Sequence, residues 1–388
     1  MRIVYCIPHL YNSGGMERVL TQKVNWLAAH TDYEITIITT ELTPVGQSDV
    51  YFELDERVRV EALGIDFNAD YHKHILSKYI GHARRLRAYK RALINYIRAN
   101  EIDLCISLGG KEVAFISTLP CRTMVEFHFA KDHRQQLLDA NHTGWFWHVL
   151  GRIRTWQLVR DVRSVGQIVV LTEKDRQDWQ QAGCTNVKCI PNPCAIKYRV
   201  VSSEYGEQSI KTLLAVGRLH EQKGFDMLLE AWNNVQRDNV QCTKDWTLRI
   251  VGEGEQRKKL EEQIRDLHLS NVVLAGRVEN MVEEYAAASL FVLSSRYEGL
   301  PLALIEAMWC GVPCVSFDCP HGPAELLEDD RGWLVPANDV EKLTQQIIYA
   351  MSHSEEAMER AQRAQEYAYE KYSEANIMPQ WVQLIENI

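Results

Sequence analysis

Two carboxylates that lie eight residues apart, Glu298 and Glu306, could bind the hydroxyl groups of a ligand. Glu298 precedes a turn with Gly299, and Pro301 can start the helix in which Glu306 falls. A helix N-terminus that a glycine leaves open has free backbone N–H groups, which bind anions such as phosphate. Carboxylates on both sides of that anion accept hydrogen bonds from hydroxyls. The segment therefore predicts a site for a phosphate flanked by hydroxyl-bearing groups, which is the order of groups in a nucleotide-sugar.

A pair of cations upstream supports this interpretation. Residues 213–216 are typical of a buried strand, and a loop with Arg218 and Lys223 follows before a helix that begins at Phe225. Both cations can reach over the end of the strand, where they would neutralise a diphosphate as it leaves the sugar. An arginine and a lysine after a strand are more often solvated surface groups. Their combination with the two carboxylates favours the phosphate site.

The first half of the chain offers two further candidates. Gly14 and Gly15 follow the first strand and begin a helix, so that backbone could approach a ligand there. No third glycine completes a dinucleotide fingerprint, and ordinary turn chemistry explains the pair equally well. His128 ends a predicted strand, and in a doubly wound sheet that end of a strand faces the ligand. The chain has 13 histidines, so an inert His128 is the alternative.

No metal or cofactor is expected. The triplet Asp-x-Asp occurs nowhere in the sequence, so the usual carboxylate platform for a divalent ion on a nucleotide is missing. The ten cysteines form no CxxC pair, which favours buried structural thiols over a zinc site. Positive side chains and helix dipoles would then have to stabilise the leaving group.

Strands and helices alternate along both halves of the 388 residues, which predicts an α/β protein with two doubly wound domains. Their domain limits are predicted at 1–191 and 210–372, with a Pro-punctuated linker at 192–209. A final helix, 373–388, either packs on its own domain or crosses back to the first. A cleft between the domains would be the natural ligand site.

A run of cations marks residues 72–98, which contain no acid although the whole chain has a formal net charge of −9. Apolar residues recur there at helical spacing, so we expect a basic amphipathic helix. Such a face is either simply solvated or binds an anionic partner, and no nucleic-acid module accompanies it. Residues 145–156 also mix aromatics with cations, as interfacial anchors do. The candidates for contact with a membrane or acceptor anion are Lys78, Arg84, Arg85, Arg87 and Arg91.

The sequence shows neither a signal peptide nor a run long enough to span a membrane. We therefore expect a cytoplasmic protein, peripheral on the inner face of the cell membrane.

Several motifs in a fixed order carry a resemblance that covers nearly the whole chain: GGMER, VLTEKDRQDW, IPNP, VGRLHEQKG, EGLPLALIEAM and GWLVP. The chain resembles the retaining GT-B glycosyltransferases of family 4, which include bacterial enzymes that build lipopolysaccharide, O-antigen and capsule. The resemblance implies two Rossmann-like domains that face each other across a cleft, the first binding the acceptor and the second the nucleotide-sugar.

The resemblance also implies a role for each candidate residue. Glu298 would contact the donor sugar, and Glu306 would contact the ribose hydroxyls. Arg218 and Lys223 would hold the diphosphate with the backbone around Gly299, Leu300 and Leu302. Gly14 and Gly15 would approach the donor from the other domain, with His128 near the anomeric carbon. Backbone around Arg277 and Val278 would read the base, while contacts of His321 and Glu325 with ligand stay open.

Together these features predict metal-independent, retaining transfer of a hexose or N-acetylhexosamine from a nucleotide-sugar, with UDP as the leading carrier, to a glycan hydroxyl. A polyprenyl-diphosphate-linked glycan is the expected acceptor. Two alternatives stay open at this point: a soluble GT-B sugar or glucan transferase, and a nucleotide-sugar-binding protein without activity.

Overall fold

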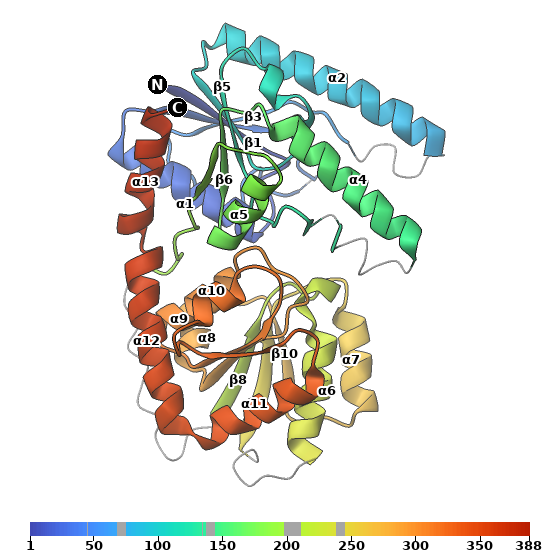
Figure 1. Cartoon of the computed structure of the whole chain (residues 1–388), viewed down its shortest axis with the longest axis vertical. Helices are drawn as coiled ribbons and strands as arrows, with labels where there is room; N and C mark the ends of the chain where they lie inside the picture. The colour runs from blue at the N-terminus through green and yellow to red at the C-terminus, as the bar shows by residue number, and fades with distance from the viewer. Residues whose placement is uncertain (45, 68–74, 134, 137–143, 198–210, 238–244) are drawn as a thin grey trace. The chain divides into compact units, whose positions relative to one another are not determined.

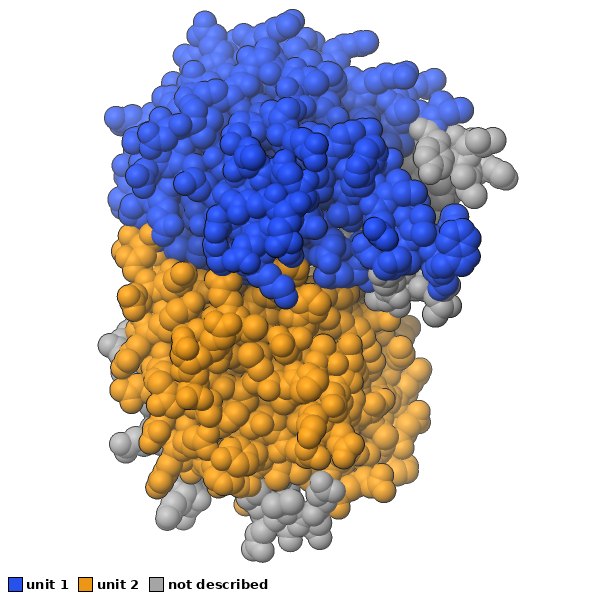
Figure 2. Space-filling model, in the orientation of Figure 1, with its two compact units in different colours: residues 1–191, 377–388 blue, residues 192–376 orange. Residues whose placement is uncertain are grey.

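The computed structural model describes the chain except residues 45, 68–74, 134, 137–143, 198–210 and 238–244. The chain divides into two compact units (Figure 2). Unit 1 comprises Met1–Pro191 together with Ile377–Ile388, and unit 2 comprises Asn192–Asn376. The end of the chain therefore belongs with the beginning, and each unit is considered by itself below.

Unit 1 is built on a parallel sheet of seven strands in the order β3-β2-β1-β4-β5-β6-β7. Its central strands are continuous apolar runs because helices cover both faces of the sheet. The strands are β1 (Arg2–Ile7), β2 (Glu34–Thr39), β3 (Arg59–Ala62), β4 (Leu104–Ser107), β5 (Arg122–Glu126), β6 (Gln167–Val170) and β7 (Val187–Cys189).

Two sets of helices cover the faces of this sheet (Figure 1). Apolar residues of α1 (Gly15–His30) and α13 (Glu374–Glu386) pack in one core with alternate residues of β1. Apolar residues of α2 (Ile75–Ala99), α4 (Trp145–Val162) and α5 (Glu173–Gln181) pack in the core on the other face. Two 3-10 turns, η1 (Lys111–Ala114) and η2 (Ile116–Thr118), follow β4.

Unit 2 has a parallel sheet of six strands in the order β10-β9-β8-β11-β12-β13. The chain winds outward from β8 in one direction and then restarts at β11 on its other side, so the topological switch point lies between these two strands. The strands are β8 (Lys211–Val216), β9 (Trp246–Val251), β10 (Val272–Gly276), β11 (Leu290–Leu293), β12 (Cys314–Asp318) and β13 (Trp333–Pro336).

The turn η3 (Glu221–Lys223) and seven helices complete unit 2 among the described residues. They are α6 (Phe225–Arg237), α7 (Arg257–Asp266), α8 (Met281–Ala286), α9 (Leu302–Trp309), α10 (Pro323–Leu327), α11 (Val340–Ser352) and α12 (Ser354–Tyr372). The strongly amphipathic α6 buries its apolar side, including Leu228 and Trp232, in the core against the sheet.

The predicted α/β class, with two doubly wound sheets, is confirmed. The sequence did not predict β3 and β7, which are short strands at the two edges of the first sheet. An edge strand pairs with one neighbour only, and the residues of β3 are largely exposed. Such a strand lacks the apolar run that marks the central strands. Within the described residues, the structure has no helix that combines the length and apolar composition required to cross a bilayer.

Candidate active site

The carboxyl ends of β8 and β11 bring together the two loops that carry the cation and carboxylate candidates. These strands pair directly, so the loops at 217–224 and 294–301 leave the sheet side by side. Ser294 Oγ donates to the carbonyl oxygen of Lys223 at 2.9 Å, and Gln222 Nε2 donates to that of Tyr297 at 3.0 Å. The backbone N–H of Arg296 donates to Gln222 O at 2.8 Å. The two loops are therefore fixed to one another.

Lys223 and Glu298 form an ion pair at the centre of this arrangement. Lys223 Nζ lies 2.7 Å from Glu298 Oε1, and Ser295 Oγ donates to the same oxygen at 2.6 Å. The side chains are only 19% and 7% exposed, so solvent screens the pair weakly. Gly217 leaves room for the lysine stem, because a Cβ there would lie 3.0 Å from Lys223 Cε. One predicted cation and one predicted carboxylate thus meet in the protein.

The turn after Glu298 presents the start of α9. Pro301 has an extended backbone and is the N-cap, so α9 begins at Leu302, one residue later than the sequence predicted. The first N–H groups of an α-helix have no acceptor inside the helix, and the helix dipole makes this end positive. Gly322, with φ of +89°, packs closely against this turn, and a Cβ at Gly322 would lie only 2.5 Å from Pro301 Cδ. The backbone around Leu302 can therefore bind an anion beside Lys223.

Glu306, Arg218 and the segment after β10 lie around this centre without joining the pair. Glu306 is buried in α9, at 4% exposure, and accepts a 2.9 Å hydrogen bond on Oε2 from the hydroxyl of Tyr285. Arg218 is 71% exposed and lies 3.2 Å from Glu255. Arg277 is exposed and Val278 is half-buried directly after β10. The structure thus brings Lys223 and Glu298 together, and directs the guanidinium of Arg218 to another acid.

In unit 1, the start of α1 is met by a carboxylate of the chain itself. Gly14 is the N-cap of α1 and Gly15 its first residue. A Cβ on Gly14 would lie 2.2 Å from Glu17 Oε2, and His9 Nδ1 lies 3.2 Å from Glu17 Oε1. Burial raises the pKa of Glu17, while its own backbone N–H, His9 and His128 act against that rise. An anionic ligand approaching these glycines would encounter the Glu17 carboxylate.

His128 lies just beyond β5, beside a buried acid. Its side chain is nearly enclosed, and Nε2 is 3.2 Å from Glu126 Oε1, an oxygen that also pairs with Lys23. Sequence reasoning missed both Glu126 and Lys23. The available signal was a lysine inside the apolar face of the first helix, followed much later by an acid that ends a buried strand.

The basic residues of α2 and the aromatic residues of α4 are exposed on unit 1. Arg84, Arg87 and Arg91 are exposed and Arg85 is half-buried, while the side chain of Lys78 falls outside the described residues. No ion pair involves Arg84, Arg87 or Arg91 within the part of the chain that the structure describes. Along α4, apolar side chains at helical spacing reach solvent, with Trp145 as much as 79% exposed: Trp145, Phe146, Val149, Ile153 and Trp156.

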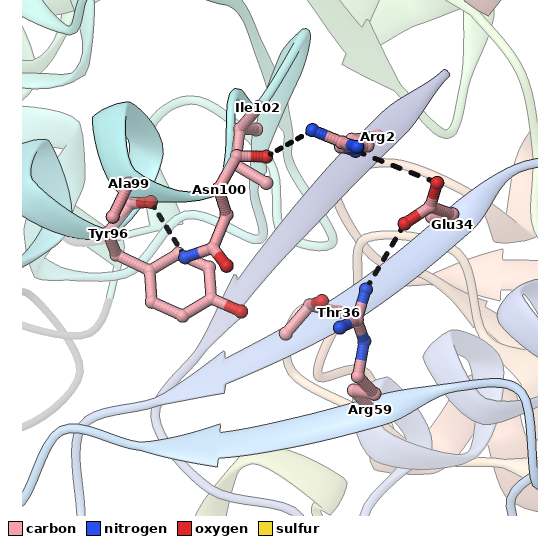
Figure 3. Close-up of a pocket in the computed structure, with 8 residues that line it drawn as sticks. All are labelled: Arg2, Glu34, Thr36, Arg59, Tyr96, Ala99, Asn100 and Ile102. Atoms are coloured by element: carbon pink, nitrogen blue, oxygen red, sulfur yellow. Dashed lines mark hydrogen bonds and ion pairs between the residues drawn. The ribbon is translucent and has the colours of Figure 1, made fainter.

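A pocket of about 260 Å³ lies at the opposite, amino-terminal edge of the unit 1 sheet (Figure 3). Both of its arginines already have an acid partner in the pocket, because Glu34 lies 3.6 Å from Arg2 and 3.3 Å from Arg59. None of the candidate residues lines it. The pocket is therefore separate from the candidate site.

Residues 210–353 match the family model for glycosyl transferases group 1. The chain is 31% identical over 351 residues to the amylovoran biosynthesis glycosyltransferase AmsD of Erwinia amylovora, a match that covers 89% of both proteins. It is also 25% identical over 393 residues to a Campylobacter jejuni protein, covering 100% of this chain and 99% of the other. That protein is named GalNAc-α-(1→4)-GalNAc-α-(1→3)-diNAcBac-PP-undecaprenol α-1,4-N-acetyl-D-galactosaminyltransferase.

Among solved structures, a mutant of TarM from S. aureus in complex with Fondaparinux, α-GlcNAc-glycerol and UDP superposes with a TM-score of 0.75 at 18% identity. The match covers 99% of both chains. Likeness of this kind shows the fold, and it confirms the predicted GT-B fold of two Rossmann-like domains.

Proposed function

Since the chain belongs to the group 1 glycosyl transferases, we propose that it moves a hexose or N-acetylhexosamine from a nucleotide-sugar to a glycan hydroxyl. One observation carries this proposal: the Lys223–Glu298 pair lies beside the open N-terminus of α9 at the switch point of the second sheet. A cation next to a positive helix end suits a diphosphate, and a carboxylate within reach suits sugar hydroxyls.

The free protein suggests how donor binding would proceed. Lys223 neutralises Glu298 until a diphosphate arrives, and its ammonium then turns to the phosphate oxygens. Glu298, still held by Ser295, becomes available to the hydroxyls of the sugar. Arg218 is exposed, and its long side chain can leave Glu255 for the same diphosphate. Glu306 would accept from the ribose, oriented by the hydroxyl of Tyr285.

Transfer breaks the bond between the anomeric carbon and the phosphate oxygen and forms one from that carbon to the acceptor oxygen. The acceptor proton passes to the departing phosphate. Lys223 and the α9 dipole stabilise the negative charge that develops on this phosphate, and we propose that no divalent ion is needed. The missing Asp-x-Asp triplet supports this view. We further propose retention, since the Campylobacter relative is named for an α linkage, which an α-linked donor gives only with retention.

UDP is the carrier we favour, because the superposed TarM complex contains UDP. For the acceptor we propose a polyprenyl-diphosphate-linked glycan in cell-surface polysaccharide synthesis. The Campylobacter relative is named for an acceptor on PP-undecaprenol, and AmsD is named for amylovoran biosynthesis. We assign acceptor binding to unit 1 and donor binding to unit 2.

An anionic membrane surface is the partner we propose for α2 and α4. The cations of α2 would attract anionic headgroups, and the exposed aromatic side chains of α4 would enter the headgroup region. Both helices pack in the same core, on one face of the first sheet. This attachment would place the enzyme at the inner face of the cell membrane.

A transfer assay tests the proposed function. The protein is mixed with polyprenyl-diphosphate-linked glycans and each of a panel of UDP- and GDP-sugars, with EDTA present, and glycan products are separated by mass and linkage. We expect an α-linked product from a UDP-sugar in EDTA. Activity that EDTA abolishes and Mg²⁺ restores would refute metal independence. Transfer only to soluble sugars would favour the alternative of a soluble transferase.

A further inference from the structure

A buried ion pair in unit 1 lies next to His128, the histidine that the family resemblance places near the donor sugar. Lys23 of α1 and Glu126 at the end of β5 are 1% and 0% exposed, and Lys23 Nζ contacts Glu126 Oε1. Their positions are 103 residues apart in the sequence. Removing two charges from water is costly, and well-packed apolar residues would avoid that cost. Stability alone therefore does not explain the Lys23–Glu126 pair.

His128 lies beside this pair. The strand β5 ends at Glu126, and His128 follows two residues later in a bend, with its ring against the Glu126 carboxylate. Phe127, between them, stacks on Trp179, with ring centroids 4.8 Å apart. Glu126 Oε1 thus lies between Lys23 Nζ and His128 Nε2, which is 3.2 Å away.

The last helix, α13, covers the Lys23–Glu126 pair through Trp381. Lys23 Nζ lies 3.5 Å from the centroid of the Trp381 ring on α13, a cation–π contact in a site without solvent. Trp381 itself is almost fully buried in the same core as α1. Water therefore does not reach the ammonium, and the carboxylate is its ionic partner.

Glu126 is held ionised by its neighbours. Burial raises the pKa of Glu126, but the charge of Lys23 and the contact with His128 outweigh it and lower that pKa to about 2. Glu17 interacts with His128 as well, and His9 Nδ1 lies 3.2 Å from Glu17 Oε1. An ionised carboxylate accepts hydrogen bonds and cannot donate them. His128 Nε2 is buried and has no well-aligned hydrogen-bond partner within the described residues, while Glu126 Oε1 lies 3.2 Å away. Because that carboxylate can only accept, the contact favours a proton on Nε2.

We propose that Lys23 and Glu126 are positioning residues, which hold the His128 ring with its proton on Nε2 and so leave Nδ1 as the acceptor that faces a hydroxyl of the transferred sugar. This role of Nδ1 rests on the proposed function. The position of the proton does not, because it follows from the contacts within unit 1. Lys23 keeps Glu126 charged, and Glu126 fixes the ring.

The test combines NMR with kinetics. Wild-type protein labelled with ¹⁵N-histidine gives the protonated nitrogen of each neutral ring, and H128Q identifies the His128 signals. Either single change would leave an unpaired buried charge and could unfold unit 1. The double variant K23M/E126Q removes both charges at nearly constant volume. Thermal unfolding and UDP titration, the latter reporting on unit 2, check that this variant is intact.

We expect wild-type His128 to be protonated at Nε2 and the double variant to lose that preference, since a glutamine can donate as well as accept. The kcat should fall about 10- to 100-fold, the range seen when a metal-binding histidine loses its hydrogen-bond partner, with an unchanged Kd for UDP. A wild-type ring protonated at Nδ1 would overturn the proposal, as would a double variant with wild-type ring signals and kcat. If the wild-type protein transferred no sugar, the proposed function would fail while the NMR result still decided the proton position.

Discussion

Lys223 has Glu298 as its partner in the free protein, and a bound diphosphate would replace that partner. The exchange leaves Glu298 with a hydrogen-bond donor, because Ser295 still donates to it when the ammonium leaves. It also implies that Lys223 contributes more to the departing phosphate than to the intact donor, since negative charge grows as the sugar leaves.

We predict that K223A lowers kcat about 10²- to 10³-fold, the effect of removing one group that stabilises developing charge. The KM for the acceptor should stay within about twofold, since unit 1 is unchanged. The exposed Lys259 on α7 provides the matched control, and K259A should behave as wild type. Steady-state kinetics with saturating donor measure the difference. A K223A enzyme with wild-type kcat would remove Lys223 from the mechanism.

At the scale of elements, one ion pair joins the start of α6 to the loop that carries Glu298. Arg296 donates two hydrogen bonds to Asp226, at 2.8 and 2.7 Å, and a third to the carbonyl oxygen of Glu221 at 2.7 Å. Burial raises the pKa of Asp226, but the hydrogen bonds and charge of Arg296 outweigh it, so the pKa lies below its ordinary value of 3.8. The pair therefore stabilises the folded form only while Asp226 is ionised.

We expect D226N to lose about 1 to 2 kcal/mol of unfolding free energy at pH 7. Because the pKa of Asp226 is lower in the folded protein, its contribution is fully present above the unfolded value of 3.8 and disappears as pH falls through the folded value. Urea unfolding at pH 7 and pH 3 should show the gap between wild type and D226N closing in acid. D266N, at an exposed site on α7, is the control, and a gap independent of pH would contradict this explanation.

The helices α2 and α4 give a second prediction at this scale. We expect wild-type protein to sediment with vesicles that contain an anionic lipid, less so at high salt. Since each cation near such a surface is worth about 1 kcal/mol, reversing three in R84E/R87E/R91E should weaken binding at least 100-fold. The matched control reverses three exposed cations of unit 2, as K258E/K259E/R265E, and should bind like wild type. Equal sedimentation of the two triple variants would exclude α2 as the contact.

At the scale of the whole molecule, the last helix completes the core of the first unit. Ile377, Met378, Trp381 and Ile385 of α13 are buried with residues of α1 and β1, although they follow unit 2 in the sequence. The first unit therefore folds around both ends of the chain.

Substitution of Trp381 tests how far the stability of unit 1 depends on α13. W381A should cost about 3 to 5 kcal/mol by leaving a cavity in the core of unit 1 and exposing the Lys23 ammonium. W145A removes the same side chain from an exposed position on α4 and should leave stability nearly unchanged. Urea unfolding followed by circular dichroism compares the two, and similar losses would mean that α13 does not support unit 1.

Much of this architecture could be predicted from the sequence, because central parallel strands are long apolar runs and their carboxyl ends share one edge. The residue types also predicted that Lys223 and Glu298 belong to one site, and the two side chains form an ion pair. The sequence could not predict the pairing of Lys23 with Glu126, since a lysine on a helix is usually solvated and only the packing of α1 and α13 on the sheet buries it. The ion pair of Arg218 with Glu255 could not be predicted either, because Arg218 is exposed and no packing fixes its side chain.

We propose above all that unit 2 holds the diphosphate of the donor between Lys223 and the start of α9. A crystal structure of the protein with UDP, grown in EDTA, tests this most directly. We predict phosphate oxygens within hydrogen-bond distance of Lys223 Nζ and the N–H of Leu302, and ribose hydroxyls at Glu306. UDP bound elsewhere, with the Lys223–Glu298 pair intact, would contradict this binding site.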